Sequence, residues 1–517
     1  MIELLESRIA PAGLIVVTLS NGNVLLKDGP DDAGDESAIL TQPADGKLVI
    51  TPAANVSVRF LDTTTEPGIP LTLDGFTGDL VASFGGGNDS LTLNGGTYSG
   101  DVRINLGDAR KNPLPAEVSG NYFVANGVTF GGAFIYNGGA QPDSVEFYGS
   151  TTVVEKKFSV SLGSGANQFI ANVSDFQLKS GMQISSGTGN DLIVFKGAKL
   201  AVTGGLSVRS GAGSDTIQFT SGISDLSVSE DLSIISSGSR SVTVEQSITG
   251  VAKISVLGSL KMTAGTGDRV QQTLTGTTDS LEIEGSVRFS ATNPTEHTQS
   301  ITASGTGFTV AGAIVLNSRG LTSSQTLSVH TSTEKVIGGS VSLRGATSAI
   351  LSVNATLSEP ASIITSSGRS ASVSVIDTTF GGVLRIVTKD TFGKTASITL
   401  NGIDATGAID ITGGAGATTL KVDQTHVSHT FKASLGDGTN RFLIEQESQD
   451  GVSAFTEDVE LIGGRDVDIF LIGGTGNNAL HFVAEVIANG RGGIDTLTEG
   501  EASTHADGRV LVKRSIP

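Results

Sequence analysis

The sequence predicts an all-β protein, a single right-handed parallel β-helix (β-solenoid) with three short strands per rung and about 17 rungs of about 25 residues. One observation is a recurring unit: Gly-x-Φ-x-Φ, where Φ is apolar, then a Gly/Ser-rich turn ending in Asp or Asn, then a second Φ-x-Φ. The unit is clearest over residues 205–219, and aligned turns end at Asn167, Asp191 and Asp215, 24 residues apart. The other observation is that apolar residues inside each unit alternate with period two, which favours strands over helices. Together they are typical of a solenoid.

The apolar pair of the second strand persists where the Asp is lost, so it extends the repeat over most of the chain. The expected series is Leu91/Leu93, Val145/Phe147, Phe169, Ile193/Phe195, Ile217/Phe219, Val242/Val244, Val270, Ile301, Leu327/Val329, Leu351/Val353, Val373/Val375, Ile398/Leu400, Leu420/Val422, Phe442/Ile444, Phe470 and Leu497. A preceding strand keeps the same spacing, and many units add a third strand, such as Leu200/Val202.

Composition restricts the core and the partners. There are 69 Gly, no Cys and no Trp in 517 residues, so the core must be built from Val, Ile, Leu and Phe, without disulfides or thiolate metal sites. The formal charge of −19 disfavours nucleic acid as a partner and favours solubility or cation binding. No stretch of apolar residues is long enough to span a membrane as a helix. The N-terminus lacks a secretory signal, so export would need another signal.

Three regions are expected from these patterns. Residues 1–70, with an acidic loop at 31–36, form an N-terminal arm and cap, because the open end of a solenoid needs covering. Residues 71–500 form the parallel β-helix, with a loop insertion near 107–121. Residues 501–517 form a C-terminal strand or cap.

The Asp-bearing turns are the best candidates for chemistry. Residues 85–91 and 187–193 match most of the nonapeptide G-G-x-G-x-D-x-U-x, which binds Ca²⁺ through Asp carboxylates and turn carbonyls, and they resemble RTX repeats locally. The candidate calcium ligands are Asp89, Asp143, Asp191, Asp215, Asp468 and Asp495. In the same slot of other turns stand Asn167, Asn440, Asn478 and Thr418. The simpler interpretation is that Asp or Asn closes the turn through backbone contacts. No cofactor is required, and Ca²⁺ is the alternative.

A second signal lies at the N-terminus. Residues 4–12, Leu-Leu-Glu-Ser-Arg-Ile-Ala-Pro-Ala, resemble the LEPR-like segment L-E-x-R-I-A-P-A that opens large repeat-rich surface proteins of planctomycete and verrucomicrobial type, with Ser7 where Pro is commonest. The resemblance implies a role in sorting or attachment at the cell surface for Glu6, Arg8 and Pro11. The alternative interpretation is an ordered arm that packs Leu4, Leu5 and Ile9 onto the first rung.

The sequence predicts a non-enzymatic structural protein of the bacterial cell surface or extracellular matrix, one that assembles head to tail into filaments or forms an adhesin shaft. The expected partners are further copies of the chain and cell-surface polysaccharide. One alternative is a calcium-binding, RTX-like secreted protein. Another is a β-helix polysaccharide lyase or hydrolase, which would need clustered carboxylates with Arg or Lys on one face, whereas the acidic residues here are spread one per turn. No catalytic residue is assigned, and His426 and His429 are expected to be a solvated pair.

Overall fold

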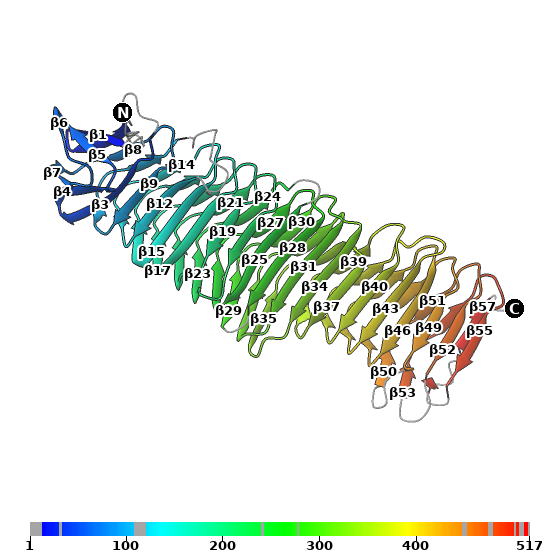
Figure 1. Ribbon diagram of the computed structural model, residues 1–517. Coiled ribbons are helices and arrows are strands. Elements are labelled where there is room, and N and C mark those ends of the chain that lie inside the picture. Colours follow the sequence, from blue (N-terminus) through cyan, green and yellow to red (C-terminus); the bar gives the residue numbers. More distant parts are fainter. Residues whose placement is uncertain are drawn as a thin grey trace, which may run out of the picture. The chain divides into compact units, whose positions relative to one another are not determined.

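The computed structural model describes residues 13–29, 34–107, 120–238, 242–276, 279–446, 452–473, 479–500, 503–505 and 511–514. These residues form strands and turns without a helix, and they build a parallel β-solenoid of about 15 turns, which confirms the predicted fold class. The chain divides into two compact units, Met1–Val251 and Ala252–Pro517. Figure 1 shows the strands of each unit following one another in chain order. No helix suited to crossing a membrane occurs in the part of the chain that is described.

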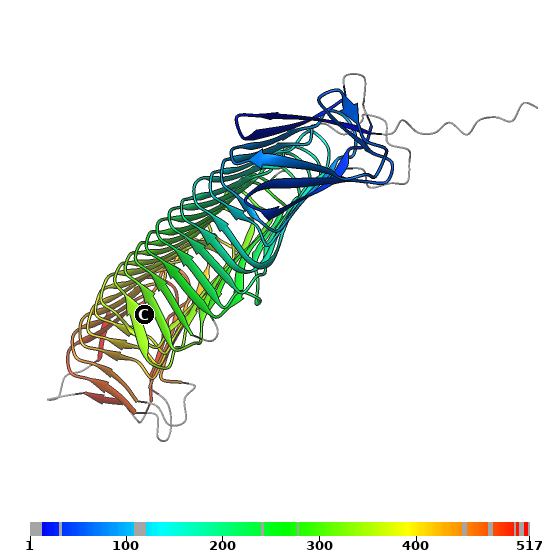
Figure 2. The same ribbon diagram turned by 90° about the vertical axis from the view of Figure 1, so that its left-hand side faces the viewer.

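Unit 1 begins with strands that are not solenoid turns: β1 (Leu14–Ser20), β2 (Asn23–Asp28), β3 (Ser37–Ala44), β4 (Gly46–Pro52), β5 (Ser57–Phe60), β6 (Thr63–Thr64) and β7 (Leu71–Phe76). β1 pairs with β2, and β4 with both β3 and β7, in antiparallel fashion (Figure 2). β2 and β3 also continue in parallel onto β8 and β9 of the first solenoid turn. The antiparallel strands therefore lie against the first turn.

Each later turn of unit 1 contributes strands to two or three faces. The first face holds β8 (Leu80–Ser83), β11 (Val102–Asn105), β14 (Phe134–Asn137), β16 (Phe158–Ser161), β18 (Met182–Ser185), β21 (Leu206–Ser210) and β24 (Leu232–Ser236). The second face holds β9 (Ser90–Asn94), β12 (Asn121–Asn126), β15 (Asp143–Val154), β17 (Gln168–Leu178), β19 (Leu192–Phe195), β22 (Thr216–Phe219) and β25 (Thr243–Val251). The third holds β10 (Thr97–Tyr98), β13 (Thr129–Phe130), β20 (Lys199–Val202) and β23 (Asp225–Val228), while β15 and β17 bend from the second face onto it.

Unit 2 repeats this plan. Its first face holds β27 (Leu260–Ala264), β30 (Val287–Ala291), β33 (Ile314–Ser318), β36 (Val341–Ala346), β39 (Ala361–Thr365), β42 (Leu384–Val387), β45 (Ile409–Thr412), β48 (Phe431–Ser434), β51 (Val459–Ile462), β54 (Val486–Asn489) and β57 (Leu511–Arg514). Its second face holds β28 (Arg269–Gly276), β31 (Glu296–Ala303), β34 (Thr322–Val329), β37 (Ser348–Val353), β40 (Ala371–Ile376), β43 (Thr395–Asn401), β46 (Ala417–Asp423), β49 (Arg441–Ile444), β52 (Ile469–Ile472) and β55 (Thr496–Glu499). Its third face holds β26 (Lys253–Val256), β29 (Ser280–Ile283), β32 (Gly307–Val310), β35 (Glu334–Ile337), β38 (Thr356–Leu357), β41 (Thr379–Phe380), β44 (Asp404–Ala405), β47 (His426–Val427), β50 (Val452–Phe455), β53 (Ala479–Phe482) and β56 (Ser503–His505).

The core of each unit is a stack of equivalent side chains. Because neighbouring strands pair in parallel and in register, each inward residue lies over its counterpart one turn away. Phe195 stacks on Phe219 with ring centroids 4.4 Å apart, and Phe442 stacks on Phe470 at 4.5 Å. All four rings are essentially buried. The repeat therefore converts one sequence pattern into a continuous apolar column.

The register predicted over part of the repeat is wrong. The inner position that Ile217 occupies is taken one turn later by Gln246, whereas Val242/Val244 was the expected pair. In unit 2 the same inner position as Val373 holds Gln272, Gln299, Gln325 and Ala349, so the expected apolar residues from Val270 to Val353 are displaced from it. Ile301, Leu327 and Leu351 occupy the next inner position, that of Val375. These glutamines are fully buried. The amide of Gln299 donates to the side-chain oxygen of Gln272 at 2.9 Å, and that of Gln325 to Gln299 at 2.8 Å. A hydrogen-bonded amide column thus replaces apolar residues, which an apolar pattern cannot identify.

Glycine is required where consecutive turns approach closely. A Cβ atom on Gly213 would lie 1.7 Å from the carbonyl oxygen of Gly189, and one on Gly189 would lie 1.9 Å from that of Gly165. Both Gly189 (φ 136°) and Gly213 (φ 155°) also have backbone angles that L-residues rarely adopt. The turns are rich in glycine for two reasons: consecutive turns lie too close together for a Cβ atom, and the backbone of the turn has positive φ angles.

Candidate functional site

The six aspartates predicted as calcium ligands lie in one position of the turn, two residues before the first inward residue of the second face. We call the residues in this position the capping column. In unit 1 it contains Glu36, Asp89, Asn121, Asp143, Asn167, Asp191, Asp215 and Val244. In unit 2 it contains Val270, His297, Ser323, Thr347, Ala371, Ala396, Thr418, Asn440, Asp468 and Asp495. All of these residues except Thr347 are buried.

Several side chains of the capping column accept a hydrogen bond from the backbone of the preceding turn. The backbone N–H of Asn167 donates to Oδ1 of Asp191 at 3.0 Å, and the N–H of Asp191 donates to Oδ1 of Asp215 at 3.2 Å. In unit 2 the N–H of Asn440 donates to Asp468 at 3.1 Å, and the N–H of Asp468 to Asp495 at 2.9 Å. Each side chain thereby satisfies a buried backbone donor at the corner between two faces, which would otherwise destabilise the fold.

Some members of the column also close their own turn. The Asn167 amide donates to the carbonyl oxygens of Gly163 and Gly165, each at 3.0 Å. Oδ2 of Asp468 accepts the N–H of Gly464 at 2.8 Å, and Oδ2 of Asp143 accepts that of Gly139 at 3.0 Å. The Asp and Asn side chains therefore link turns and shape them at once.

Burial makes the charged form of these carboxyls costly. It raises the pKa of Asp89 to about 7 and those of Asp215 and Asp468 to about 6. It also raises the pKa of Asp191, although hydrogen bonds from Ser186 and Asn167 act in the opposite direction. Asparagine in the same column offers the same acceptor without a charge.

The calcium assignment stays a prediction. Within the described residues, no group of three or more His, Asp or Glu side chains is arranged to hold a metal ion. Asn478 and the predicted attachment residues lie outside the described residues. The latter are Leu4, Leu5, Glu6, Arg8, Ile9 and Pro11.

His297 is a member of the capping column that the sequence did not indicate. Its ring nitrogens lie 2.8 Å from the Ser318 hydroxyl and 3.1 Å from Oε1 of Gln272. Burial lowers the pKa of His297 to about 3, so the ring is neutral near pH 7. Of the expected histidine pair, His429 is exposed and lies 2.9 Å from Glu457.

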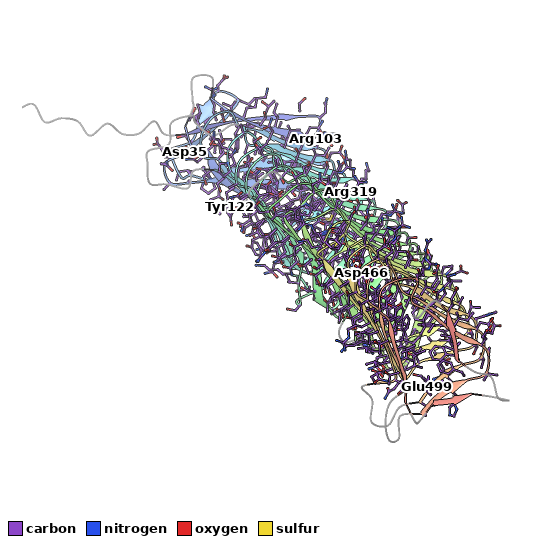
Figure 3. The ribbon with its side chains drawn as sticks, turned by 90° about the vertical axis from the view of Figure 1, so that its right-hand side faces the viewer. Asp35, Arg103, Tyr122, Arg319, Asp466 and Glu499 are labelled. Atoms are coloured by element: carbon purple, nitrogen blue, oxygen red, sulfur yellow. The ribbon has the colours of Figure 1, made fainter. Side chains whose placement is uncertain are left out.

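A polar cluster in unit 1 was also missed. Glu146 on β15 accepts hydroxyl hydrogen bonds from Tyr122 at 3.0 Å, from Tyr148, and from Ser144 at 3.1 Å. The Tyr122 side chain comes from the preceding turn and is partly exposed (Figure 3). A hollow of about 340 Å³ opens beside the cluster and is lined by Gly120, Asn121, Tyr122, Pro142, Asp143, Ser144, Glu146, Ala166 and Gln168. The alternation Ser-x-Glu-x-Tyr at 144–148 was the available signal, because it marks the outer side of a strand.

Comparison with known proteins gives no relative: no family model, no curated protein and no solved structure matches the chain.

Proposed function

We propose that this protein is a non-enzymatic structural component of the bacterial cell surface or extracellular matrix, which assembles end to end into filaments or forms the shaft of an adhesin. The observation that supports this most strongly is the capping column, in which buried polar side chains are used to join one turn to the next. A chain whose buried polar groups tie successive turns together resists bending, which is what a shaft requires.

Self-assembly is supported by the last turn of unit 2. Among the described strands, β55 pairs only with β52, so no described strand lies along its other edge. Leu497 on β55 is partly exposed, whereas Phe470, one turn earlier in the same column, is fully buried. Ile494, just before β55, is 78 % exposed. An edge with exposed apolar side chains is a template for another chain, and in this proposal a second copy covers it.

The test is whether the protein assembles in solution. Sedimentation velocity and electron microscopy measure this over a wide range of protein concentration. We expect polymers that grow with concentration. The double variant Thr496→Lys/Thr498→Lys, with two charges on the β55 edge, should stay monomeric. The matched control, Gln271→Lys/Thr298→Lys, adds the same charge on exposed positions of β28 and β31 and should polymerise. Deletion of residues 1–12 tests the N-terminal segment and leaves β1 intact. A wild-type protein that remains monomeric throughout would contradict the proposal.

A second candidate, a polysaccharide lyase or hydrolase, is favoured only by the cluster around Glu146, where this carboxylate, bonded to two tyrosines, borders a hollow together with Tyr122. A carboxylate and a tyrosine hydroxyl are groups that can move protons in cleavage of a glycosidic chain. Incubation with an anionic polysaccharide, comparing wild type with Glu146→Gln, decides between the two. If the wild type cleaves the polysaccharide and Glu146→Gln does not, the protein is an enzyme and the structural proposal is wrong.

A further inference from the structure

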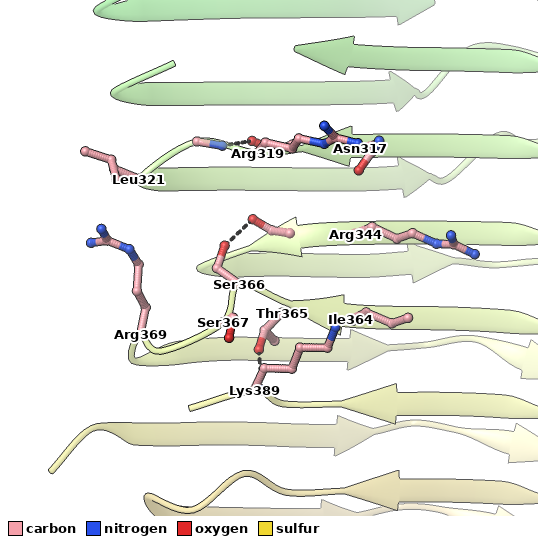
Figure 4. A pocket seen from close by; sticks show the side chains of 13 residues that line it. Asn317, Arg319, Leu321, Arg344, Ile364, Thr365, Ser366, Ser367, Arg369 and Lys389 are labelled. Carbon is pink, nitrogen blue, oxygen red and sulfur yellow. Dashed lines mark hydrogen bonds between the residues drawn. The ribbon is translucent and has the colours of Figure 1, made fainter. Parts of the chain in front are cut away.

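Five basic residues gather on four successive turns of unit 2. Arg319 follows β33, Arg344 lies on β36, Arg369 follows β39, and Lys389 and Lys394 follow β42. They border two adjoining hollows of about 530 and 520 Å³, which share Leu321, Ser367 and Arg369 in their lining. We call this surface the basic groove; Figure 4 shows Arg319, Arg344, Arg369 and Lys389 within it.

The positive charges of the groove are not neutralised by neighbours. All five side chains are exposed, and none makes an ion pair with any residue in the described ranges. Neither hollow has Asp or Glu in its lining. The nearby Asp390 is buried, and its two oxygens accept the N–H groups of Gly414 at 3.3 Å and Gly416 at 3.0 Å. In a chain of net charge −19, such a cluster marks a site for an anion.

Hydrogen bonds fix the turns that carry these cations. The Ser318 hydroxyl accepts the N–H of Gly320 at 3.1 Å, and the Thr365 hydroxyl accepts the N–H of Lys389 at 3.0 Å. The Ser366 hydroxyl donates to the carbonyl oxygen of Gly345, one turn earlier. Four of the cations thus project from anchored turns and Arg344 from β36, and the groove also holds exposed hydroxyls such as that of Ser367. This mixture of cations and hydroxyls suits a ligand that carries both anions and hydroxyl groups.

Apolar side chains are exposed in the groove and in the loop between its two lysines. Leu321 in the lining is 52 % exposed, and Phe392, in the loop between Lys389 and Lys394, is 84 % exposed. An exposed aromatic ring can pack against the apolar face of a sugar ring. The turns that carry the cations stack about 4.8 Å apart, and Arg344, in register with Asn317, is offset along its strand from Arg319 and Arg369. The overall negative charge disfavours nucleic acid.

We propose that the basic groove binds a linear anionic polysaccharide, whose carboxylates or sulfates pair with Arg319, Arg344 and Arg369 on successive turns. This site goes beyond the structural role proposed above, since a filament needs no such groove. It would give the solenoid a specific contact with an acidic polysaccharide coat or matrix.

The test measures binding of the full chain, kept below its assembly concentration, to polygalacturonate, dextran sulfate, neutral dextran and single-stranded DNA. We expect binding to at least one of the two anionic polysaccharides, weakened by salt, and little binding to neutral dextran. Arg319→Gln/Arg344→Gln/Arg369→Gln should weaken it by about tenfold or more, since each exposed ion pair contributes modestly. The control Lys261→Gln/Arg288→Gln/Arg385→Gln removes the same charge from exposed positions of β27, β30 and β42, outside the groove, and should weaken binding less than about twofold.

Polygalacturonate and dextran sulfate distinguish a carboxylate from a sulfate ligand. Equal losses in the groove and control variants would show that net charge alone is responsible and would overturn the proposal. Tighter binding to single-stranded DNA, equal binding to neutral dextran, or binding to neither anionic polysaccharide would also overturn it. Since monomeric protein is used, failure here leaves the assembly result unaffected, and the reverse holds as well.

Discussion

The turns at the equivalent corner of unit 1 and of unit 2 use charge in opposite ways. In unit 1 the turns ending at Asn167, Asp191 and Asp215 direct carboxyl or amide groups inward, where they bond to the backbone. In unit 2 the turns that carry Arg319 and Arg369 direct cations outward, and Arg344 on β36 between them is exposed as well. In those turns the capping column holds neutral residues such as Ser323 and Ala371. The column therefore does not require a charge, so the outer face of the turn is free to acquire a separate chemistry.

The largest expected effect comes from removing a cap in unit 1. Asn167→Ala deletes an acceptor for the N–H of Asp143 and donors to two carbonyl groups, so we expect it to lower the free energy of unfolding by about 2–4 kcal/mol. The matched change in unit 2, Thr347→Ala, removes a hydroxyl that accepts one N–H and donates to one carbonyl group, and should cost about 1 kcal/mol. Urea unfolding measures both. Equal losses would show that the two corners depend on their caps alike.

Sequence patterns could predict most of the fold, because the inward residues of a parallel solenoid recur at a fixed spacing. Ile193 and Phe195 lie in β19, as the alternation predicts. The buried column of Gln272, Gln299 and Gln325 could not be predicted in this way, because their amides satisfy one another only when the turns are stacked. A polar residue at an inward position can be recognised only from its hydrogen-bond partner, which lies about 25 residues away in the sequence.

The two regions should also respond oppositely to pH. Folding raises the pKa of Asp215 from an ordinary 3.8 to about 6, so the acidic turns lose stability as pH rises from about 4 to 6. Folding lowers the pKa of His297 from 6.5 to about 3, so its surroundings lose stability as pH falls from about 6.5 toward 3, by on the order of 3 kcal/mol at pH 4. Hydrogen exchange measures the two pH responses separately, from peptides around Asp215 and around His297. The exchange rates are corrected for the pH dependence of intrinsic exchange.

The control for this comparison is His297→Asn, which places in unit 2 a residue that the capping column uses elsewhere. It should remove the acid sensitivity of the surrounding peptides and leave those around Asp215 unchanged. If the stability around Asp215 and the stability around His297 changed with pH in the same direction, the opposite pKa shifts given to these two residues would be contradicted.

The smallest expected effect concerns the basic groove. Phe392→Ala should weaken binding of the anionic polysaccharide by about twofold to fivefold, an amount typical of one exposed contact, and leave unfolding unchanged because the ring is 84 % exposed. Isothermal titration and thermal unfolding measure the two effects. A loss of stability without a loss of affinity would show that the Phe392 ring stabilises the fold and does not contact the polysaccharide.

The candidate sites were only partly predictable. The aspartates and the neutral residues Asn167, Asn440 and Thr418 were correctly placed in one slot, because the turn pattern fixes it. The basic groove was not predicted from the sequence, although Arg319, Arg344 and Arg369 follow one another at intervals of 25 residues. Along the chain they look like isolated surface charges, and only stacking of the turns brings them onto one surface.

The most direct test of the account is the stability of Asp215→Asn, measured by urea unfolding near pH 7.5 with a chelator and with Ca²⁺. If the carboxyl serves as a buried backbone cap, the neutral amide keeps the acceptor and loses the cost of a buried charge. The variant should then be more stable by about 1–3 kcal/mol, with no effect of Ca²⁺ on either protein. A variant less stable than wild type, together with a wild type that Ca²⁺ stabilises, would contradict the account and assign the acidic turns to calcium.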